Sequence, residues 1–228
     1  MALYTIGDLH LSLSGDKPMD RFGESWQNHA AKLREGFQGL GEGDLTVLCG
    51  DLSWAMSLEG AEEDFRFIHE LPGKKLILKG NHDYWWNTAT KAYQFFDAHG
   101  FDSLEILHNN AFVYGDFALC GTRGWFYEED HGTEHDRKMM LREIGRLETS
   151  LKAGGDREKI VFLHYPPVFR NYRCEEILRL LREYEVRRCY YGHIHGRGIP
   201  LAFNGWIGCT EFRLVSADAL RFVPLEVA

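Results

Sequence analysis

Five short apolar runs, each followed by an aspartate, an asparagine or a histidine, are the feature of this sequence that most restricts its possible folds. The runs are rich in β-branched or aromatic residues and end at glycine or a polar residue, which is typical of β-strands. They comprise Leu3–Ile6, Leu45–Cys49, Leu76–Leu78, Ile160–Leu163 and Cys189–Tyr191. We therefore expect strands that are spread along most of the chain to meet in a sheet.

Apolar residues spaced three or four positions apart lie between these runs and predict amphipathic helices. The stripes are Trp26-Ala30-Leu33-Phe37-Leu40, Leu58-Ala61-Phe65-Ile68, Met140-Ile144-Leu147-Leu151 and Ile177-Leu181-Tyr184. Residues 104–120 and 205–224 are instead predicted as consecutive strands joined by tight turns, the clearest of which is Tyr114-Gly115-Asp116. Strands that alternate with helices, together with some hairpins, predict an α/β layered fold with mixed sheets. Because the sequence shows no internal repeat and no Pro/Ser-rich linker, we expect a single domain over residues 1–228.

The charge of the chain bears on its partners. Of its residues, 44% are hydrophobic and 26% charged, so the chain can bury a core. Lys and Arg number 26 against 34 Asp and Glu, a formal net charge of −8, and no basic block or stripe is present. Because phosphate backbones are bound by clustered Lys and Arg, we expect no dedicated nucleic-acid surface.

Cysteine usage and the N-terminus predict a location. The five cysteines are odd in number and form no CxxC pair, and Cys49, Cys120 and Cys189 lie inside apolar runs. Buried thiols in a reducing compartment are therefore favoured over a disulfide framework. The N-terminus has no basic region typical of a signal peptide, and no apolar run approaches the ~20 residues that span a bilayer. We expect a soluble, cytoplasmic protein that does not bind a membrane.

The residues that follow the five runs are candidates for a single site. In α/β sheets, ligands bind at the carboxyl ends of the strands, so residues far apart in sequence would converge there. The blocks are Gly7-Asp8-Leu9-His10, Gly50-Asp51, Gly80-Asn81-His82-Asp83, His164 and Gly192-His193-Ile194-His195.

The donor atoms in these blocks indicate metal binding. Candidate ligands that supply oxygen or imidazole nitrogen are Asp8, His10, Asp51, Asn81, His164, His193 and His195. Seven ligands are too many for one catalytic ion that must keep an open position, but they suit two ions that share a bridging carboxylate. Imidazole mixed with carboxylate favours Mn, Fe, Zn or Co over Mg or Ca. Two divalent ions, two aspartates and a hydroxide leave a net positive site, which would attract an anionic substrate.

In this order, the five blocks resemble the calcineurin-like metallophosphoesterases over residues 8–195. The stretches Lys17-Pro18-Met19-Asp20 and Asn81–Trp86 are similar to an uncharacterised bacterial subgroup of predicted phosphohydrolases. The resemblance implies a four-layer αββα sandwich of two mixed β-sheets flanked by helices, with the strands of 206–224 in the second sheet. One departure is Leu163, where Gly or Ala is commoner; only the following imidazole would bind metal.

The resemblance also implies a role for each matching residue. One metal site would use Asp8, His10, Asp51 and His195, and the other Asp51, Asn81, His164 and His193, with Asp51 as the bridge. His82 matches a catalytic histidine that is not a ligand, and Asp83 the carboxylate that orients it. The implied activity is hydrolysis of small phosphomonoesters or phosphodiesters by in-line attack of a hydroxide that bridges two transition-metal ions (Mn, Fe or Zn).

Several alternatives stay open from the sequence alone. A nuclease would use the same metal centre, and some relatives of this type are non-catalytic scaffolds that bind proteins. Arg123 and Trp125 follow the apolar run that ends at Cys120, and they are candidate substrate-binding residues. Arg123 could clamp a phosphate oxygen or form a structural salt bridge. Trp54, Trp85 and Trp86 follow ligand motifs, and they could wall the site or pack in the core.

Overall fold

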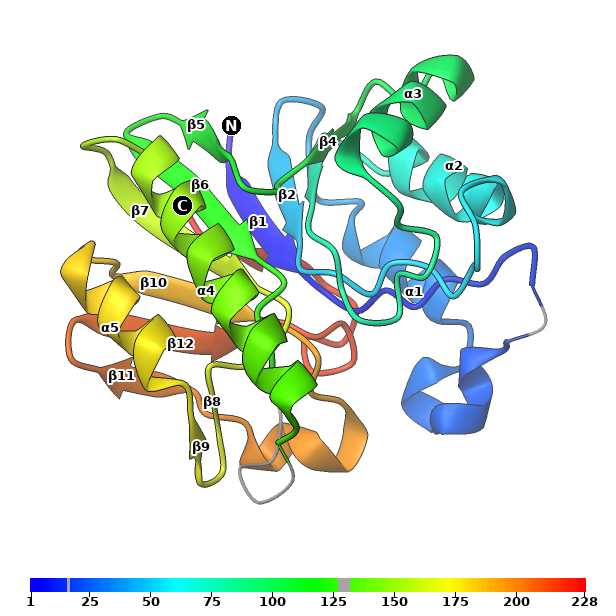
Figure 1. The fold of residues 1–228 in the computed structure, drawn as a ribbon. Coiled ribbons are helices and arrows are strands. Elements are labelled where there is room, and N and C mark those ends of the chain that lie inside the picture. The colour runs from blue at the N-terminus through cyan, green and yellow to red at the C-terminus, as the bar shows by residue number, and fades with distance from the viewer. Residues whose placement is uncertain (16, 127–131) are drawn as a thin grey trace.

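The computed structural model describes residues 1–15, 17–126 and 132–228 of the chain. Two β-sheets pack face to face, and helices cover the outer face of each (Figure 1). The first sheet is covered by α1 (His29–Gly36), α2 (Glu62–Glu70) and α3 (Ala89–His99), and the second by α4 (Glu134–Ala153) and α5 (Glu175–Glu183). The predicted four-layer sandwich is therefore confirmed.

The first sheet has the strand order β13-β1-β2-β3-β4. Four of its strands run parallel, and β13 pairs antiparallel with β1 at one edge. The strands are β1 (Leu3–Ile6), β2 (Leu45–Leu48), β3 (Lys74–Ile77), β4 (Leu104–Ile106) and β13 (Leu225–Glu226). Because β1, β2 and β3 are parallel neighbours, their carboxyl ends lie at the same edge.

The second sheet has the order β11-β12-β10-β7-β6-β5, with four parallel strands in the centre and an antiparallel strand at each edge. Its strands are β5 (Ala111–Tyr114), β6 (Phe117–Thr122), β7 (Glu158–Leu163), β10 (Arg188–Tyr191), β11 (Gly205–Ile207) and β12 (Thr210–Leu214). A short hairpin, β8 (Val168–Phe169) and β9 (Tyr172–Arg173), lies outside both sheets. Single turns of 3₁₀ helix occur at Met19–Phe22, Glu24–Trp26 and Glu59–Ala61, and a longer one at Gly196–Leu201.

Strands that are buried on both faces explain why the predicted runs are continuously apolar rather than alternating. Along β7, Ile160 and Phe162 belong to the core between the sheets, whereas Val161 and Leu163 pack in the core beneath α4 and α5. Each fully buried side chain of this size contributes roughly 1.5–3 kcal/mol to folding. Among the helices in the described part of the chain, none is long and apolar enough to cross a membrane.

The structure differs from the predicted elements in four places. Helix α3 was not predicted, although its Ala92, Phe95 and Phe96 pack against the first sheet. Residues 215–224 form turns and irregular chain rather than strand, apart from a single β-bridge between Ser216 and Gly7. The last strand, β13, lies beyond the predicted strands and joins the first sheet. The stripe from Trp26 to Leu40 is also shorter as an α-helix than predicted, because α1 covers only eight residues.

Candidate metal centre

The seven predicted ligands lie at the carboxyl ends of five strands, three in the first sheet and two in the second. Asp8, His10, Asp51 and His193 have φ angles of 59°, 46°, 53° and 72°, in the left-handed region that is uncommon for residues other than glycine. Such strained backbone typically persists where the surrounding structure holds it for a functional reason. A Cβ at Gly80 would collide with the Asp51 carboxylate, and one at Gly192 with that of Asp8. Glycine thus lets the chain pass close to both carboxylates.

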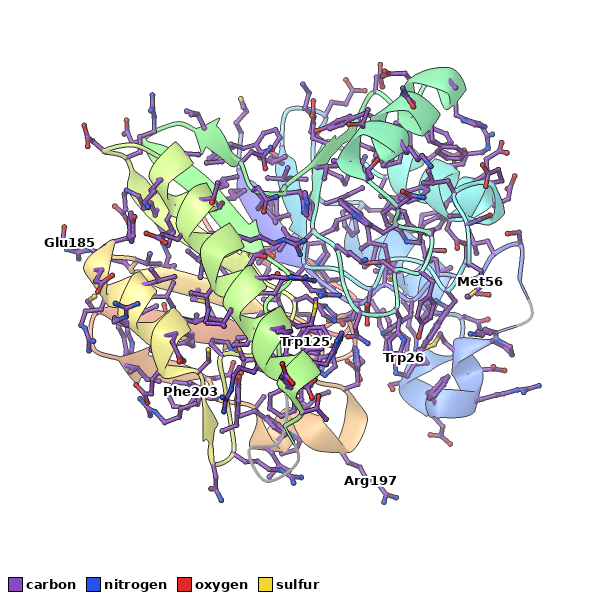
Figure 2. All side chains as sticks on the ribbon, viewed as in Figure 1. Trp26, Met56, Trp125, Glu185, Arg197 and Phe203 are labelled. Atoms are coloured by element: carbon purple, nitrogen blue, oxygen red, sulfur yellow. The ribbon has the colours of Figure 1, made fainter. Side chains whose placement is uncertain are left out.

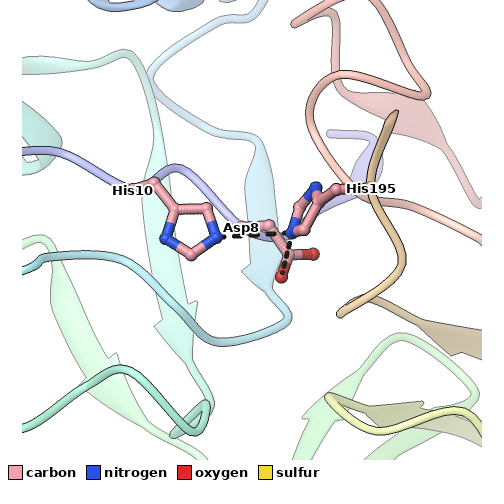
Figure 3. Close-up of side chains that lie close together, drawn as sticks. All are labelled: Asp8, His10 and His195. Atoms are coloured by element: carbon pink, nitrogen blue, oxygen red, sulfur yellow. Dashed lines mark hydrogen bonds and ion pairs between the residues drawn. The ribbon is translucent and has the colours of Figure 1, made fainter. Parts of the chain in front are cut away.

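A first cluster consists of Asp8, His10 and His195 (Figure 3). His195 Nε2 lies 3.2 Å from Asp8 Oδ1 and 3.3 Å from His10 Nε2. Asp8 is fully buried and His10 nearly so, at 3% exposure. The other ring nitrogen of His195, Nδ1, lies 3.0 Å from Asp218 Oδ1, which orients the ring.

A second cluster consists of Asp51, His164 and His193, together with the side-chain oxygen of Asn81. Asn81 Oδ1 lies 2.6 Å from His164 Nε2 and 2.9 Å from His193 Nδ1. His164 Nδ1 lies 3.0 Å from the carbonyl oxygen of Cys49, so this nitrogen carries the hydrogen. The second cluster thus unites residues that are as much as 142 positions apart in the sequence.

Asp51 stands between the two clusters. Its Oδ2 lies 3.8 Å from His10 Nε2 in the first cluster and 3.5 Å from His164 Nε2 in the second. Its Oδ1 accepts a hydrogen bond of 2.7 Å from the backbone N–H of His82. A carboxylate that faces a group of ligands on each side is in the position of a bridging ligand.

The hydrogen-bond pattern of the histidines fits bound cations. A carbonyl oxygen and a carboxylate only accept hydrogen bonds, so His164 and His195 each carry a hydrogen on Nδ1. In the neutral rings Nε2 then presents a lone pair, which in His164 faces Asn81 Oδ1 and in His195 faces Asp8 Oδ1. Lone pairs that face one another at these distances require a proton or a cation between them. Oxygen and imidazole donors, each oriented by a further contact, suit a transition metal.

The ionisation of these groups is strongly perturbed by burial and by one another. Burial alone would raise the pKa of Asp8, but the adjacent His195, followed by His164 and His10, holds it below the usual range. Burial opposes the protonation of His195, yet Asp8 and Asp218 raise its pKa to about 10. Burial raises the pKa of Asp51 and lowers that of His193, the latter to about 3. A cation bound at these atoms would take the place of the shared protons, because metal ligands must be deprotonated.

The environment of His82 differs from the prediction. Its ring Nδ1 lies 3.1 Å from Tyr84 Oη, and its centroid is 4.4 Å from that of the Trp54 ring. Burial, followed by the charge of His164, lowers the pKa of His82, so the protein alone does not favour the protonated ring. His82 lies beside both clusters without belonging to either, as expected for a residue that is not a ligand.

Asp83 does not orient His82, and this prediction is wrong for a physical reason. The buried carboxylate of Asp83 is occupied by five other donors. These are the backbone N–H groups of Asp51, Leu52, Ser53 and Gly80 and the indole N–H of Trp85, at 2.7–3.4 Å. Asp83 therefore joins the loop after β2 to the loop after β3, and it acts on the backbone that carries the candidate ligands Asp51 and Asn81.

Arg123 and Trp125 lie near the clusters but make structural contacts. Arg123 forms an ion pair of 3.4 Å with the fully buried Glu143 of α4, as in the structural alternative. Its guanidinium carbon lies 4.8 Å from the centroid of the Trp125 ring. The indole of Trp125 donates to Asp136 Oδ1 at 3.1 Å, close to the start of α4 (Figure 2). A role in substrate binding stays a prediction for both.

The three tryptophans have different surroundings. Trp54 stacks on His10 with centroids 4.9 Å apart, so it forms a wall of the first cluster. Trp85 packs against Phe65 in the core, and Trp86 lines a neighbouring pocket. Trp26 also contacts the ring of His195. The strand-end pattern did not identify Trp26, which lies in a 3₁₀ turn. It did not identify Asp218 either, because strand was predicted over 205–224, whereas β12 ends at Leu214, four residues before Asp218.

Comparisons with known proteins agree with this geometry. The sequence matches the family model described as calcineurin-like phosphoesterase over residues 1–197. No curated protein matches the sequence. One similar solved structure is the phosphopantetheinyl hydrolase of Mycobacterium tuberculosis, with a TM-score of 0.59 and 11% identity. The match covers 99% of this chain and 95% of that one. A protein of unknown function from Aquifex aeolicus is also similar, with a TM-score of 0.53 and 14% identity; the match covers 99% of this chain and 95% of that one. A protein from Thermus thermophilus has a TM-score of 0.54 and 13% identity, and the match covers 95% of this chain and 89% of that one. At these identities the structural likeness shows the fold alone.

Proposed function

Because this chain belongs to the calcineurin-like phosphoesterase family, and is thus a metal-dependent phosphoesterase, we propose that it works with two metal ions on small phosphomonoesters or phosphodiesters. The observation that carries the proposal is the position of Asp51, whose Oδ2 faces a histidine of each cluster at 3.8 Å and 3.5 Å. Asp8, His10 and His195 would hold one ion, and Asn81, His164 and His193 the other, with Asp51 shared. The donor set suits Mn, Fe or Zn.

The chemistry that such a pair of ions supplies is a water ionised near neutral pH and positive charge for the phosphoryl oxygens during in-line attack. The chain contributes rigid positions for it. His164 and His195 are held by Cys49 and Asp218, so each presents Nε2 toward its cluster without a search for orientation. Preorganised groups of this kind stabilise developing charge without reorganising at the moment of reaction.

His82 is proposed to assist the leaving group. Its ring lies beside the first cluster, 5.8 Å from the His10 ring between centroids, and it is half-exposed. Because the protein lowers the pKa of His82, the ring needs the negative charge of a bound phosphate nearby in order to hold the proton that it would donate. A proton given to the departing alkoxide is typically worth 10²–10⁴-fold in rate.

Two other functions are less well supported. A non-catalytic scaffold has no need of seven converging donors, four of them on strained or unusual backbone. A nuclease would need a basic surface to follow a phosphate backbone, whereas the net charge of this chain is −8.

We also propose that the protein is located in the cytoplasm.

The test is metal analysis of the full chain together with hydrolysis of a panel of mono- and diesters after loading with Mn, Zn or Fe. Wild type should hold up to two ions per chain. Asp51→Asn should lower the occupancy of both sites, whereas His10→Ala should mainly lower one. Arg179→Gln, on the exposed face of α5, is a matched control and should retain both ions. Wild type that binds no ion under these conditions would contradict the proposal, as would equal metal loss in the Asp51 and His10 variants.

A further inference from the structure

A pocket of about 540 Å³ lies outside the two metal clusters, and none of the predicted ligands lines it. Among the described residues, its cationic lining is Lys79, Arg123 and Arg146, and its one carboxylate is Glu143. Trp86 and His108, whose ring centroids are 5.3 Å apart, form an aromatic wall. The pocket is therefore lined by residues that follow β-strands and by residues of α4.

The charges in this pocket do not balance. Glu143 is fully buried and forms ion pairs with Arg146 and Arg123. It also accepts a hydrogen bond from the hydroxyl of Thr122. Three cations against one carboxylate leave two positive charges in a chain that is acidic as a whole. The buried Arg123 Nε has no hydrogen-bond partner among the described residues.

The topology puts this pocket next to the metal clusters along the same edge. The clusters lie at the ends of β1, β2 and β3 in the first sheet and of β10 and β7 in the second. Lys79 follows β3 itself, and His108 and Arg123 follow β4 and β6, the next strands outward in the two strand orders. Lys79 and Asn81 are two positions apart in the chain, a span of at most about 7 Å between their Cα atoms. The carbonyl oxygen of Arg123 accepts a hydrogen bond of 3.2 Å from the N–H of His164.

We propose that this pocket binds a second phosphate group of the substrate while the metal centre binds the phosphoryl group that is hydrolysed. The proposal rests on the proposed function and names its substrate class: phosphoesters with a further phosphate a few bonds away. Two net positive charges match a phosphate dianion, and arginine binds phosphate oxygens through two parallel N–H groups. The N-cap residue of α3, Thr88, and its first residue, Ala89, line the same pocket, and amide groups in the first turn of a helix lack partners within the helix.

A binding experiment that needs no turnover tests the pocket. Metal-loaded full-length protein is titrated by calorimetry with propane-1,3-bisphosphonate and with propylphosphonate, which differ by the second phosphonate. Wild type should bind the bisphosphonate at least tenfold more tightly. Arg146→Gln should lower that ratio to about threefold or less, since one charge-assisted contact is worth roughly tenfold or more. Arg142→Gln, one turn earlier on α4 and exposed, removes the same charge outside the pocket and should keep the full ratio.

Kinetics with adenosine 3′,5′-bisphosphate and adenosine 5′-monophosphate complete the test. The KM for the bisphosphate should be at least tenfold lower in wild type, and Arg146→Gln should remove most of this difference. Equal affinity of wild type for the two phosphonates would overturn the pocket even if simple phosphate esters are hydrolysed. Equal ratios in the Arg142 and Arg146 variants would overturn it too. An Arg146-dependent preference in a protein that hydrolyses no ester would instead support the pocket and contradict the proposed function.

Discussion

Asp83 holds together the two loops that carry candidate ligands, and Asp83→Asn tests how much this carboxylate contributes. Its Oδ2 accepts from the backbone N–H groups of Asp51 and Gly80 at 2.8 Å and 2.7 Å. Its Oδ1 accepts from three further donors, at 2.8–3.4 Å. An asparagine has one acceptor oxygen, so its NH₂ group must face one of these sets. If the oxygen serves the set of three, the N–H groups of Asp51 and Gly80 lose their partner.

The size of the effect follows from those two donors. A buried donor without a partner costs about 1–3 kcal/mol, so the variant should be less stable by roughly 2–6 kcal/mol. For a chain of this length, 1 kcal/mol shifts the melting temperature by about 2–4 °C. We expect Asp83→Asn to melt about 10 °C below wild type, and to hold less metal because the backbone at Asp51 and Gly80 is no longer fixed.

The assay is thermal unfolding followed by circular dichroism, beside metal stoichiometry. Asp64→Asn is a matched control, since Asp64 is equally buried but, within the described part of the chain, accepts only from Leu13 N–H and the Ser53 hydroxyl. A hydroxyl can accept as well as donate, so the asparagine keeps both contacts and its melting temperature should stay within about 3 °C of wild type. An Asp83→Asn protein with wild-type melting temperature and metal content, but low activity, would refute this reasoning and show that Asp83 acts through His82.

Three further predictions concern other residues. His82→Ala should keep both metals. Its kcat should fall about 10²–10⁴-fold on esters with poor leaving groups and less on esters of acidic phenols, whose leaving groups need little protonation. An equal loss of kcat across a leaving-group series would exclude proton donation by His82. Asp218→Asn should weaken metal binding at the first cluster by about 10–100-fold, because it orients His195, and competition with a chelating dye would show unchanged affinity if that orientation is unimportant. Burial lowers the pKa of Lys75 to about 8, so as the pH rises the folded chain loses this proton at a lower pH than the unfolded chain does. Stability should therefore rise between about pH 8 and 10.5 relative to Lys75→Met in denaturant titrations, and parallel curves would contradict the shift.

The secondary structure illustrates what local sequence could and could not predict. Doubly buried strands such as Leu3–Ile6 are continuous apolar runs, and their positions agree with the structure to within a few residues. Helix α3 was missed although its buried residues Ala92, Phe95 and Phe96 have the i, i+3, i+4 spacing of a helix, because they span only five residues and form a much shorter stripe than those of the predicted helices. The sheet that accepts β13 could not be predicted, since a two-residue strand has no pattern and its partner, β1, lies at the other end of the chain.

The sequence by itself determined the edge of the fold at which the site forms and the identity of its seven candidate ligands. It could do so because each candidate ligand lies within four residues of the end of a predicted strand, and parallel strands place their carboxyl ends together. Only the tertiary structure decided the partners of these side chains. Asp218 supports His195 from a segment with no strand, and Asp83 accepts from two loops rather than from His82. Such contacts depend on where separate segments cross in space, and that information lies in the packing of the two sheets rather than in any local pattern.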